Sequence, residues 1–175
     1  MKNFKNMRGF TVLELLITLG IAAVLVAVGV PGFRSVIMDN RMVSQANLLV
    51  TSVSVARSNA VKYQRNATVC ASANYDAAVP TCSASTDWST GWIVWVDKDR
   101  DATTDADEIV SVFGPLNGAS SLSSTALSAF TYDSRGFGLA GADVLVLCDD
   151  RSGEMGRRIR INAAGRTNVS RQGCS

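Results

Sequence analysis

A run of acidic residues in the middle of the chain has the spacing of a calcium-binding loop. Its members are Asp97, Asp99, Asp101, Asp105 and Glu108. They stand at positions 1, 3, 5, 9 and 12 of an EF-hand-like segment, and carboxylate oxygens suit Ca²⁺. Position 6 is Ala102, where an EF-hand has glycine, and a strand pattern precedes the loop instead of a helix. We therefore favour an exposed acidic turn between two strands. The alternative is a calcium site with the ligands Asp97, Asp99, Asp101 and Glu108.

The C-terminal segment is strongly basic and could bind phosphate groups. Residues 76–150 contain twelve acids and three bases, a net charge of −9, whereas residues 151–175 contain six arginines and one acid, a net charge of +5. Guanidinium groups contact phosphates without reading the base sequence, so double-stranded DNA is a candidate partner. The candidate residues are Arg157, Arg158, Arg160, Arg166 and Arg171. The simpler alternative is a solvated face, or arginines that pair with the acidic middle region and with neighbouring subunits.

The four cysteines follow the apolar N-terminal segment, and an even number on the exported side favours two disulfides. Histidine is absent and no two cysteines have CxxC spacing, so a zinc site is poorly supported. Three pairings are open to four cysteines. We prefer Cys70–Cys82 and Cys148–Cys174, because both pairs flank predicted turns and the second would tie the C-terminus to a core strand.

The sequence gives no support for catalysis. No nucleophile has a visible activating base, and no glycine-rich phosphate loop is present, so we expect neither an enzyme nor a cofactor. Trp88, Trp92 and Trp95 could form a base-stacking platform. However, Trp92 and Trp95 would face opposite sides of a strand. Core packing for one and partial exposure for the other is the favoured interpretation.

The N-terminal region contains an apolar run long enough to cross a membrane. Phe10 to Val30 spans 21 residues with Glu14 as the only charge, and about 20 apolar helical residues cross a bilayer core. Lys2, Lys5 and Arg8 precede it and predict a cytoplasmic N-terminus. An ordinary secretory signal has a shorter apolar stretch, of roughly 7–15 residues, and a simple anchor does not explain a carboxylate inside the bilayer.

The residues from Arg8 to Leu15, RGFTVLEL, resemble the class III signal of type IV prepilins and type II secretion pseudopilins. The resemblance implies that a prepilin peptidase cuts between Gly9 and Phe10 and that the new N-terminal Phe10 is methylated. It also implies that Glu14 pairs with the free amine of a neighbouring subunit, which would neutralise two charges in apolar surroundings. Pro31 matches a proline that kinks or loosens the family's long helix.

Beyond the apolar run, the pattern predicts a helix to about Lys62 followed by strands. An apolar stripe recurs at steps of four and three residues, at Met42, Ala46, Leu49, Val53, Ala56 and Ala60. The opposite side contains Asp39, Arg41, Ser44, Ser52 and Asn59. Strands are predicted at 68–71, 92–96, 108–113, 143–148 and 157–161, with 83–91 and 117–128 as connections. This order predicts an α+β fold, in which a long N-terminal transmembrane and amphipathic helix packs on a small antiparallel β-sheet domain.

Three later motifs resemble the GspH/FimT group of minor pilins and pseudopilins. They are Ala56-Arg57-Ser58-Asn59-Ala60, the strand from Gly91 to Asp97, and Gly165-Arg166. The group includes minor pilins of type IV pili, whose arginine-bearing C-terminal region is implicated in DNA capture during natural transformation. It also includes the H-type pseudopilin of type II secretion, which implies no DNA role.

The resemblance implies four segments. We expect a cleaved leader at 1–9, a transmembrane helix at 10–30, its amphipathic continuation at 31–62 and a periplasmic or extracellular β-rich domain at 63–175. The expected location is the inner membrane and, after assembly, the pilus or pseudopilus. The expected partners are other pilins, the prepilin peptidase, the inner membrane and, for the DNA hypothesis, double-stranded DNA.

Overall fold

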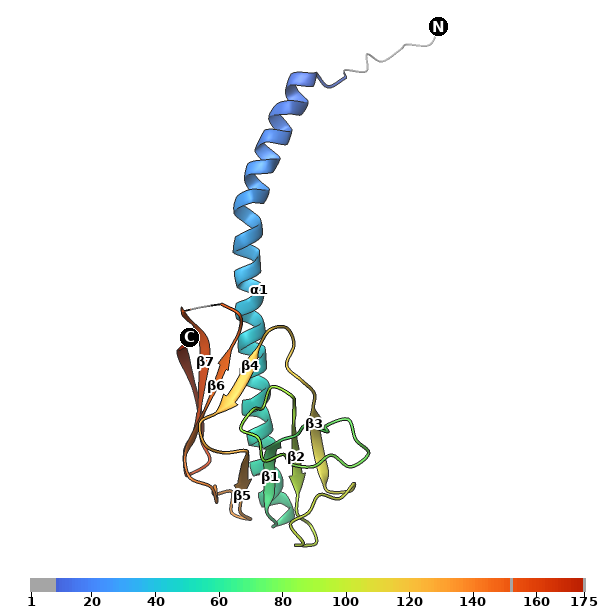
Figure 1. Cartoon of the computed structure of the whole chain (residues 1–175), viewed down its shortest axis with the longest axis vertical. Coiled ribbons are helices and arrows are strands. Elements are labelled where there is room, and N and C mark those ends of the chain that lie inside the picture. Colours follow the sequence, from blue (N-terminus) through green and yellow to red (C-terminus); the bar gives the residue numbers. More distant parts are fainter. Residues whose placement is uncertain (1–8, 152, 175) are drawn as a thin grey trace. The chain divides into compact units, whose positions relative to one another are not determined.

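The structure is a computed structural model that describes residues 9–151 and 153–174 (Figure 1). The predicted orientation depends on Lys2, Lys5 and Arg8, which lie outside the described residues. The chain divides into two compact units between Met38 and Asp39, and one helix, α1 (Val12–Tyr63), contributes to both.

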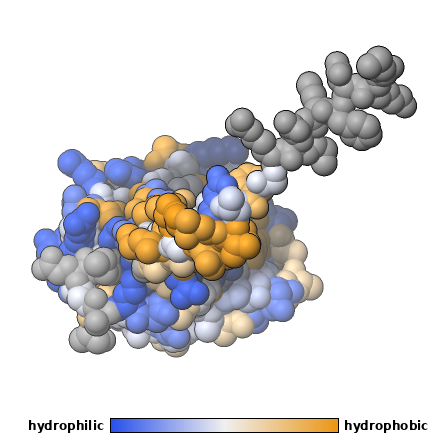
Figure 2. All heavy atoms as spheres, turned by 90° about the horizontal axis from the view of Figure 1, so that it is seen from above, coloured by the Kyte–Doolittle hydropathy of each residue, from blue (hydrophilic) through white to orange (hydrophobic). Residues whose placement is uncertain are grey.

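In the first unit, α1 is an apolar helix whose described side chains are exposed over residues 12–30 and 32–37. Thr11 caps its N-terminus, because its hydroxyl accepts a hydrogen bond of 3.2 Å from the Glu14 N–H. The helix continues through Pro31, and its length and composition suffice to cross a membrane. Figure 2 shows apolar side chains gathered at the molecular surface. Large apolar residues such as Leu13, Leu25 and Phe33 are more than half exposed. An exposed apolar surface of this extent requires lipid or another protein.

In the second unit, the amphipathic part of α1 packs on two sheets. The predicted apolar stripe is buried throughout, and none of its six residues is more than 2% exposed. On the predicted polar side, Ser44 is exposed and Asp39, Arg41 and Asn59 are half-buried, whereas Ser52 is fully buried. Trp92 explains the exception, because its indole N–H donates a hydrogen bond of 2.8 Å to the Ser52 hydroxyl. A buried indole needs an acceptor, which a serine on the helix supplies.

The β-rich part consists of two four-stranded antiparallel sheets. The first sheet has the order β3-β2-β1-β5, with β3 (Ile109–Phe113), β2 (Trp92–Val96), β1 (Ala67–Ala71) and β5 (Ala129–Tyr132). The second has the order β4-β6-β7-β8, with β4 (Ser121–Ser124), β6 (Asp143–Cys148), β7 (Gly153–Ile161) and β8 (Thr167–Cys174). Together with α1 they form the predicted α+β fold.

The five predicted strands are present, but three further strands were not predicted. Residues 117–128, interpreted as a connection, contain β4, and β5 and β8 were also missed. The sequences of β4 and β8, SLSS and TNVSRQGC, are polar. Both are edge strands, held to the sheet mainly by backbone hydrogen bonds. Their sequences therefore lack the alternation of apolar and polar residues from which a strand is predicted.

All three tryptophans are buried, which excludes an exposed stacking platform. Trp88 and Trp92 belong to the main core, and Trp92 stacks on Phe113 with ring centroids 5.4 Å apart. Trp95 lies on the opposite face of β2, as predicted, but the expected partial exposure was wrong, because it is only 7% exposed. Trp95 packs with Cys70 and Ile93, beside the connection that Cys82 fastens to β1.

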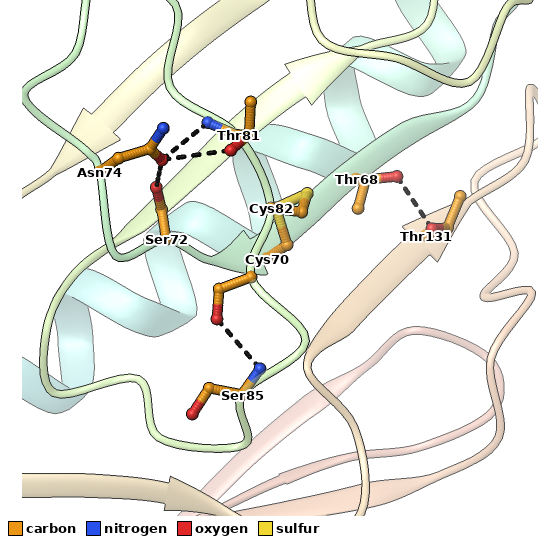
Figure 3. Close-up of a disulfide and its surroundings, with 9 residues drawn as sticks. Thr68, Cys70, Ser72, Asn74, Thr81, Cys82, Ser85 and Thr131 are labelled. Atoms are coloured by element: carbon orange, nitrogen blue, oxygen red, sulfur yellow. Dashed lines mark hydrogen bonds between the residues drawn. A yellow bond between two sulfur atoms is a disulfide. The ribbon is translucent and has the colours of Figure 1, made fainter.

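Both preferred disulfides, Cys70–Cys82 and Cys148–Cys174, are present. The first holds the connection between β1 and β2 against the sheet, where the Asn74 side-chain oxygen accepts hydrogen bonds from Ser72 and Thr81 (Figure 3). The second joins β6 to β8, which are not neighbours, since β7 lies between them. This bridge therefore spans the middle strand.

A buried carboxylate organises the link between β4 and β5. Asp143 on β6 accepts hydrogen bonds from the Ser124 and Thr125 hydroxyls and from the Val144 and Leu127 backbone N–H groups. Burial raises the pKa of the Asp143 carboxyl, but these hydrogen bonds lower it more, so its pKa lies below the ordinary value. The ionised form stabilises the fold.

Replacing this carboxylate should lower stability in a pH-dependent way. Asp143→Asn puts an amide group against backbone donors, so we expect a loss of about 1–3 kcal/mol at neutral pH. Because the folded pKa is depressed, the wild-type advantage is complete above the unfolded pKa of about 3.9 and shrinks as pH falls through the folded value. Urea titrations between pH 7 and pH 3 test this, with the exposed Asp76→Asn as control. Equal stability of both variants at pH 7 would contradict the role of Asp143.

Candidate functional site

The predicted processing and assembly residues stand at the exposed start of α1. Phe10 is 85% exposed, and a side chain added at Gly9 would meet nothing within 4 Å. Glu14 lies in the first helical turn and is exposed, and no other described residue forms an ion pair or hydrogen bond with its carboxylate. The Thr11-x-x-Glu14 spacing, which is that of a capping box, marks this helix start in the sequence.

The candidate arginines separate into three groups instead of forming one face. Arg158 and Arg160 are exposed, and their side chains share the face of β7 opposite Ile159 and Ile161, as strand alternation requires. Across the pairing register they stand next to Val146 and Val144 on β6 and to Ser170 and Asn168 on β8. No acid neighbours either arginine in this register.

The other three candidates lie elsewhere. Arg157 and Arg171 are directly paired across β7 and β8. Both therefore project to the face that also contains Ile159, away from Arg158 and Arg160. Arg166 follows the turn between the two strands and lines a groove beside α1. Arg158, Arg160, Arg166 and Arg171 therefore do not form one continuous face, because β alternation and the turn direct them to different sides.

Arg151, which contributed to the basic count of the C-terminal segment, is paired with acids. Its guanidinium contacts Asp39 at 3.0 Å and Asp149 at 2.7 Å. Burial raises the pKa of the Asp149 carboxyl, but the Arg151 hydrogen bonds and the charges of Arg151 and Arg41 lower it more. These pairs join the start of the amphipathic helix to the end of β6, so Arg151 has a structural role.

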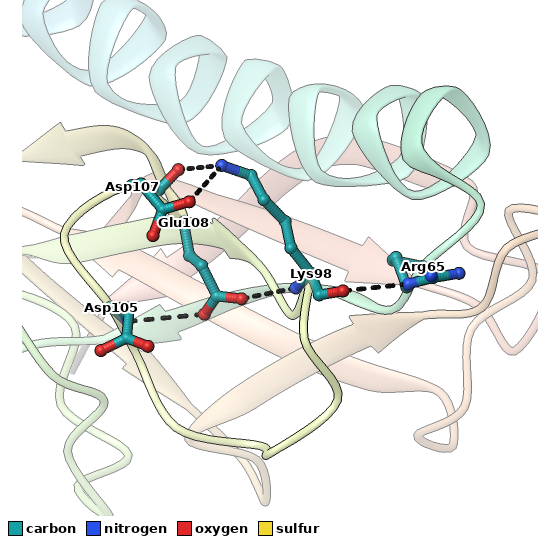
Figure 4. A network of polar contacts seen from close by, with 5 residues as sticks. All are labelled: Arg65, Lys98, Asp105, Asp107 and Glu108. Atoms are coloured by element: carbon teal, nitrogen blue, oxygen red, sulfur yellow. Dashed lines mark hydrogen bonds and ion pairs between the residues drawn. The ribbon is translucent and has the colours of Figure 1, made fainter.

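The acidic loop is ordered by its own hydrogen bonds (Figure 4). Glu108 is only 2% exposed, and its two carboxylate oxygens accept from the backbone N–H groups of Lys98 and Asp105. The Lys98 ammonium contacts Asp107. Carboxylate oxygens of Asp97, Asp99 and Glu108 lie within 4.8 Å of one another, as do those of Asp99, Asp101 and Asp105. The turn between strands is present as expected, and the calcium alternative stays a prediction.

The disulfide that spans β7 holds the arginine-bearing strands together. A Cβ atom added at Gly156 would lie 2.4 Å from the Cys174 sulfur and 2.8 Å from the Leu147 carbonyl oxygen. Only glycine therefore leaves room for the bridge to pass from β6 to β8. The bridge fastens the end of β8 to the end of β6, across Gly156 on β7.

Comparison with solved structures shows the fold of a pilin. A crystal structure of the type IV minor pilin FimU from Pseudomonas aeruginosa matches with a TM-score of 0.60 and 19% identity, over 78% of this chain and 96% of FimU. FimU in a second crystal form matches with a TM-score of 0.56 and 19% identity, over 75% and 98% of the two chains. A search of curated protein sequences finds no match.

The family assignment follows from a second comparison. Residues 45–165, more than half of the chain, match the family described as Type II transport protein GspH. The chain belongs to this family. The match confirms the predicted resemblance to the GspH/FimT group and includes the helix motif around Arg57 and the Gly165 turn.

Gly156 provides a test of the bridge that spans β7. We expect Gly156→Ala to force the backbone or the bridge to move, at a cost of about 1–3 kcal/mol, and to leave a larger fraction of Cys148 and Cys174 unpaired. Thiol counting on the denatured chain and thermal unfolding measure both effects. Gly173→Ala is the matched control, because its nearest contact would be at 3.9 Å. Complete disulfide formation with unchanged stability in Gly156→Ala would contradict this geometry.

Proposed function

We propose that this chain is a minor pilin of a type IV pilus that helps to prime or tip the filament. The observation that carries the proposal is the exposed apolar helix of the first unit, in which Glu14 is the only charge between Phe10 and Val30. Helices of this kind can bury their surface first in lipid and then against the helices of neighbouring subunits. The described fold and the similarity to FimU, itself a type IV minor pilin, support this proposal.

Processing and assembly follow from the N-terminal residues. We propose cleavage by a prepilin peptidase between Gly9 and Phe10, methylation of Phe10, and a location in the inner membrane with the β-rich unit on the periplasmic side. Glu14 then aligns neighbouring subunits in the filament. Its carboxylate pairs with the terminal ammonium of a neighbour, and this pairing avoids the cost of two isolated charges in apolar surroundings. Residues 10–30 form the membrane-spanning part of the helix, and residues 31–62 form its amphipathic continuation outside the membrane.

A minor pseudopilin of the H type is the alternative, and the family description as a type II transport protein favours it. Both proposals share the same assembly chemistry. They differ in the machinery that extends the filament, so genes next to this one, for pilus or for secretion components, separate them.

A second proposed function is the binding of double-stranded DNA through exposed arginines. Arg158 and Arg160 support it, because they lie side by side on one sheet face with no acid across either neighbouring strand. Such contacts bind the phosphate backbone and weaken as salt concentration rises. Arg157, Arg166 and Arg171 lie around the same hairpin and could add charge from its other sides.

The first test concerns processing. In Gly9→Leu, a side chain obstructs the backbone at the cleavage site, so we expect the precursor to accumulate uncut in the membrane. Immunoblotting and N-terminal sequencing of the membrane fraction measure this. Gly20→Leu, at another position with open space, should be processed normally. A Gly9→Leu protein that starts at Phe10 would refute the cleavage site.

The second test concerns Glu14. Glu14→Ala should still be cleaved and inserted, but at least about tenfold less of it should enter filaments, because the neighbour's amine loses its partner. Quantitative immunoblots of sheared filaments measure the incorporation. Thr18→Ala, a polar change one turn further along α1, should assemble normally. Wild-type levels of Glu14→Ala in the filaments would count against registration by this residue.

The third test concerns DNA. With the full chain in a maltoside detergent, we expect a non-specific Kd on the order of 10⁻⁴–10⁻⁶ M for duplex DNA. Arg158→Gln with Arg160→Gln should weaken binding and reduce the slope of log K against log salt by roughly two units. Lys62→Gln with Arg100→Gln removes the same charge elsewhere and serves as control. Equal losses of DNA affinity in both double variants would contradict a specific role of Arg158 and Arg160, because binding would then reflect only general electrostatic attraction.

A further inference from the structure

A groove on the second unit brings together two arginines that are far apart in the sequence. Its volume is about 720 Å³. One wall is formed by α1 and the other by the turn between β7 and β8. The lining residues are Ser54, Arg57, Ser58, Val61, Gly165, Arg166 and Thr167. Two positive charges thus line one groove from two separate elements.

The Arg57 side chain lies beside Gly136 and Tyr132. It is half-buried, and Gly136 lies so close that a Cβ atom there would be 3.3 Å from the Arg57 Nε. Its charge also reaches Tyr132: burial raises the pKa of Tyr132 to about 12, and Arg57 opposes that rise. The Tyr132 hydroxyl in turn donates to the Gly165 carbonyl at 3.4 Å. Arg57 and the Gly165 turn therefore both lie beside Tyr132.

The turn that presents Arg166 is equally well defined. Asn162 accepts hydrogen bonds from the Gly165 and Arg166 backbone N–H groups, at 2.8 and 2.9 Å. Gly165 has φ of +73°, and a Cβ atom there would lie 2.3 Å from the Tyr132 ring. Glycine is thus required for the turn to pack on Tyr132, which directs the following Arg166 to the groove.

Neither arginine has an acidic partner among the described residues, whereas Arg135 pairs with Asp133 and Arg151 with Asp39 and Asp149. The Ser54 and Ser58 hydroxyls donate back to α1, to the Val50 and Val55 carbonyls. The donors left for a ligand are the two guanidinium groups and the Thr167 hydroxyl. Two cations in one groove repel each other, and an anion between them would relieve the repulsion.

We propose that the Arg57–Arg166 groove binds a phosphate group. A phosphate presents oxygens in several directions, which suits donors that approach from a helix and from a turn, and guanidinium groups bind its oxygens in pairs. The phosphate can come from a DNA backbone or from a free phosphate ion. The proposal that the groove binds phosphate depends on the groove alone. Only the proposal that DNA provides this phosphate rests on the proposed function.

Inorganic phosphate tests the site directly. The full chain, labelled with ¹⁵N-arginine, is titrated with sodium phosphate in a maltoside detergent, which contains no phosphate, at constant ionic strength set by chloride. We expect the Nε–H signals of Arg57 and Arg166 to shift and saturate. Arg57→Gln and Arg166→Gln should each abolish the shift of the other arginine, and Arg100→Gln in the acidic loop should leave it unchanged. Arg166 is exposed, so its variant remains informative if Arg57→Gln fails to fold.

Duplex DNA identifies the source of the phosphate. If DNA supplies it, Arg57→Gln should weaken DNA binding about tenfold and reduce the salt slope by about one unit. Arg158→Gln with Arg160→Gln should leave the response to inorganic phosphate intact. A phosphate response without any effect of Arg57→Gln on DNA supports the groove as a site for free phosphate and removes DNA as its source. The absence of a saturable arginine shift with phosphate would overturn the proposal, whatever the chain does with DNA.

Discussion

The second unit depends on the burial of one narrow stripe of α1 against two sheets. Three of the six stripe residues, Ala46, Ala56 and Ala60, are alanines, so the helix can approach the strands closely. The hydrogen bond from Trp92 to Ser52 satisfies a buried polar pair in this seam. Because the interior is close-packed, a larger residue at Ala56 would move the helix away from the strands. It would thereby also move Arg57 relative to the turn at Gly165.

The same helix has opposite surface chemistry in its two units. Beyond Asp39 its apolar residues are covered by strands, whereas before Met38 its apolar residues are exposed. A membrane first and neighbouring helices later can both bury such a surface, and that is the physical basis of the proposed pilin assembly. The β-rich unit contributes what the helix lacks, namely two disulfides and an arginine-bearing hairpin with defined geometry.

Local patterns predicted the parts of the fold that depend on local chemistry. The helical stripe follows from periodicity, strands β2 and β6 follow from short β-branched and apolar runs, and the cysteine pairs followed from turns. Strand β8 was missed because its polar residues gain stability from pairing with β7, which no local pattern reveals. The arginines show the same limit: the charge count identified the basic C-terminal segment, but the position of Arg166 depends on how the hairpin packs. Arg57 belonged to a recognised motif, yet its proximity to Arg166 required the tertiary structure.

The most direct test of the account is the intact mass of the wild-type chain recovered from sheared surface filaments. Mass spectrometry with N-terminal fragmentation reads the start of the chain, its methylation and its two disulfides in one measurement. We expect a chain that begins at Phe10, bears one methyl group on the terminal amine and contains no unpaired cysteine. A chain confined to the membrane fraction that still begins at Met1 would contradict the claim that it is a processed filament subunit.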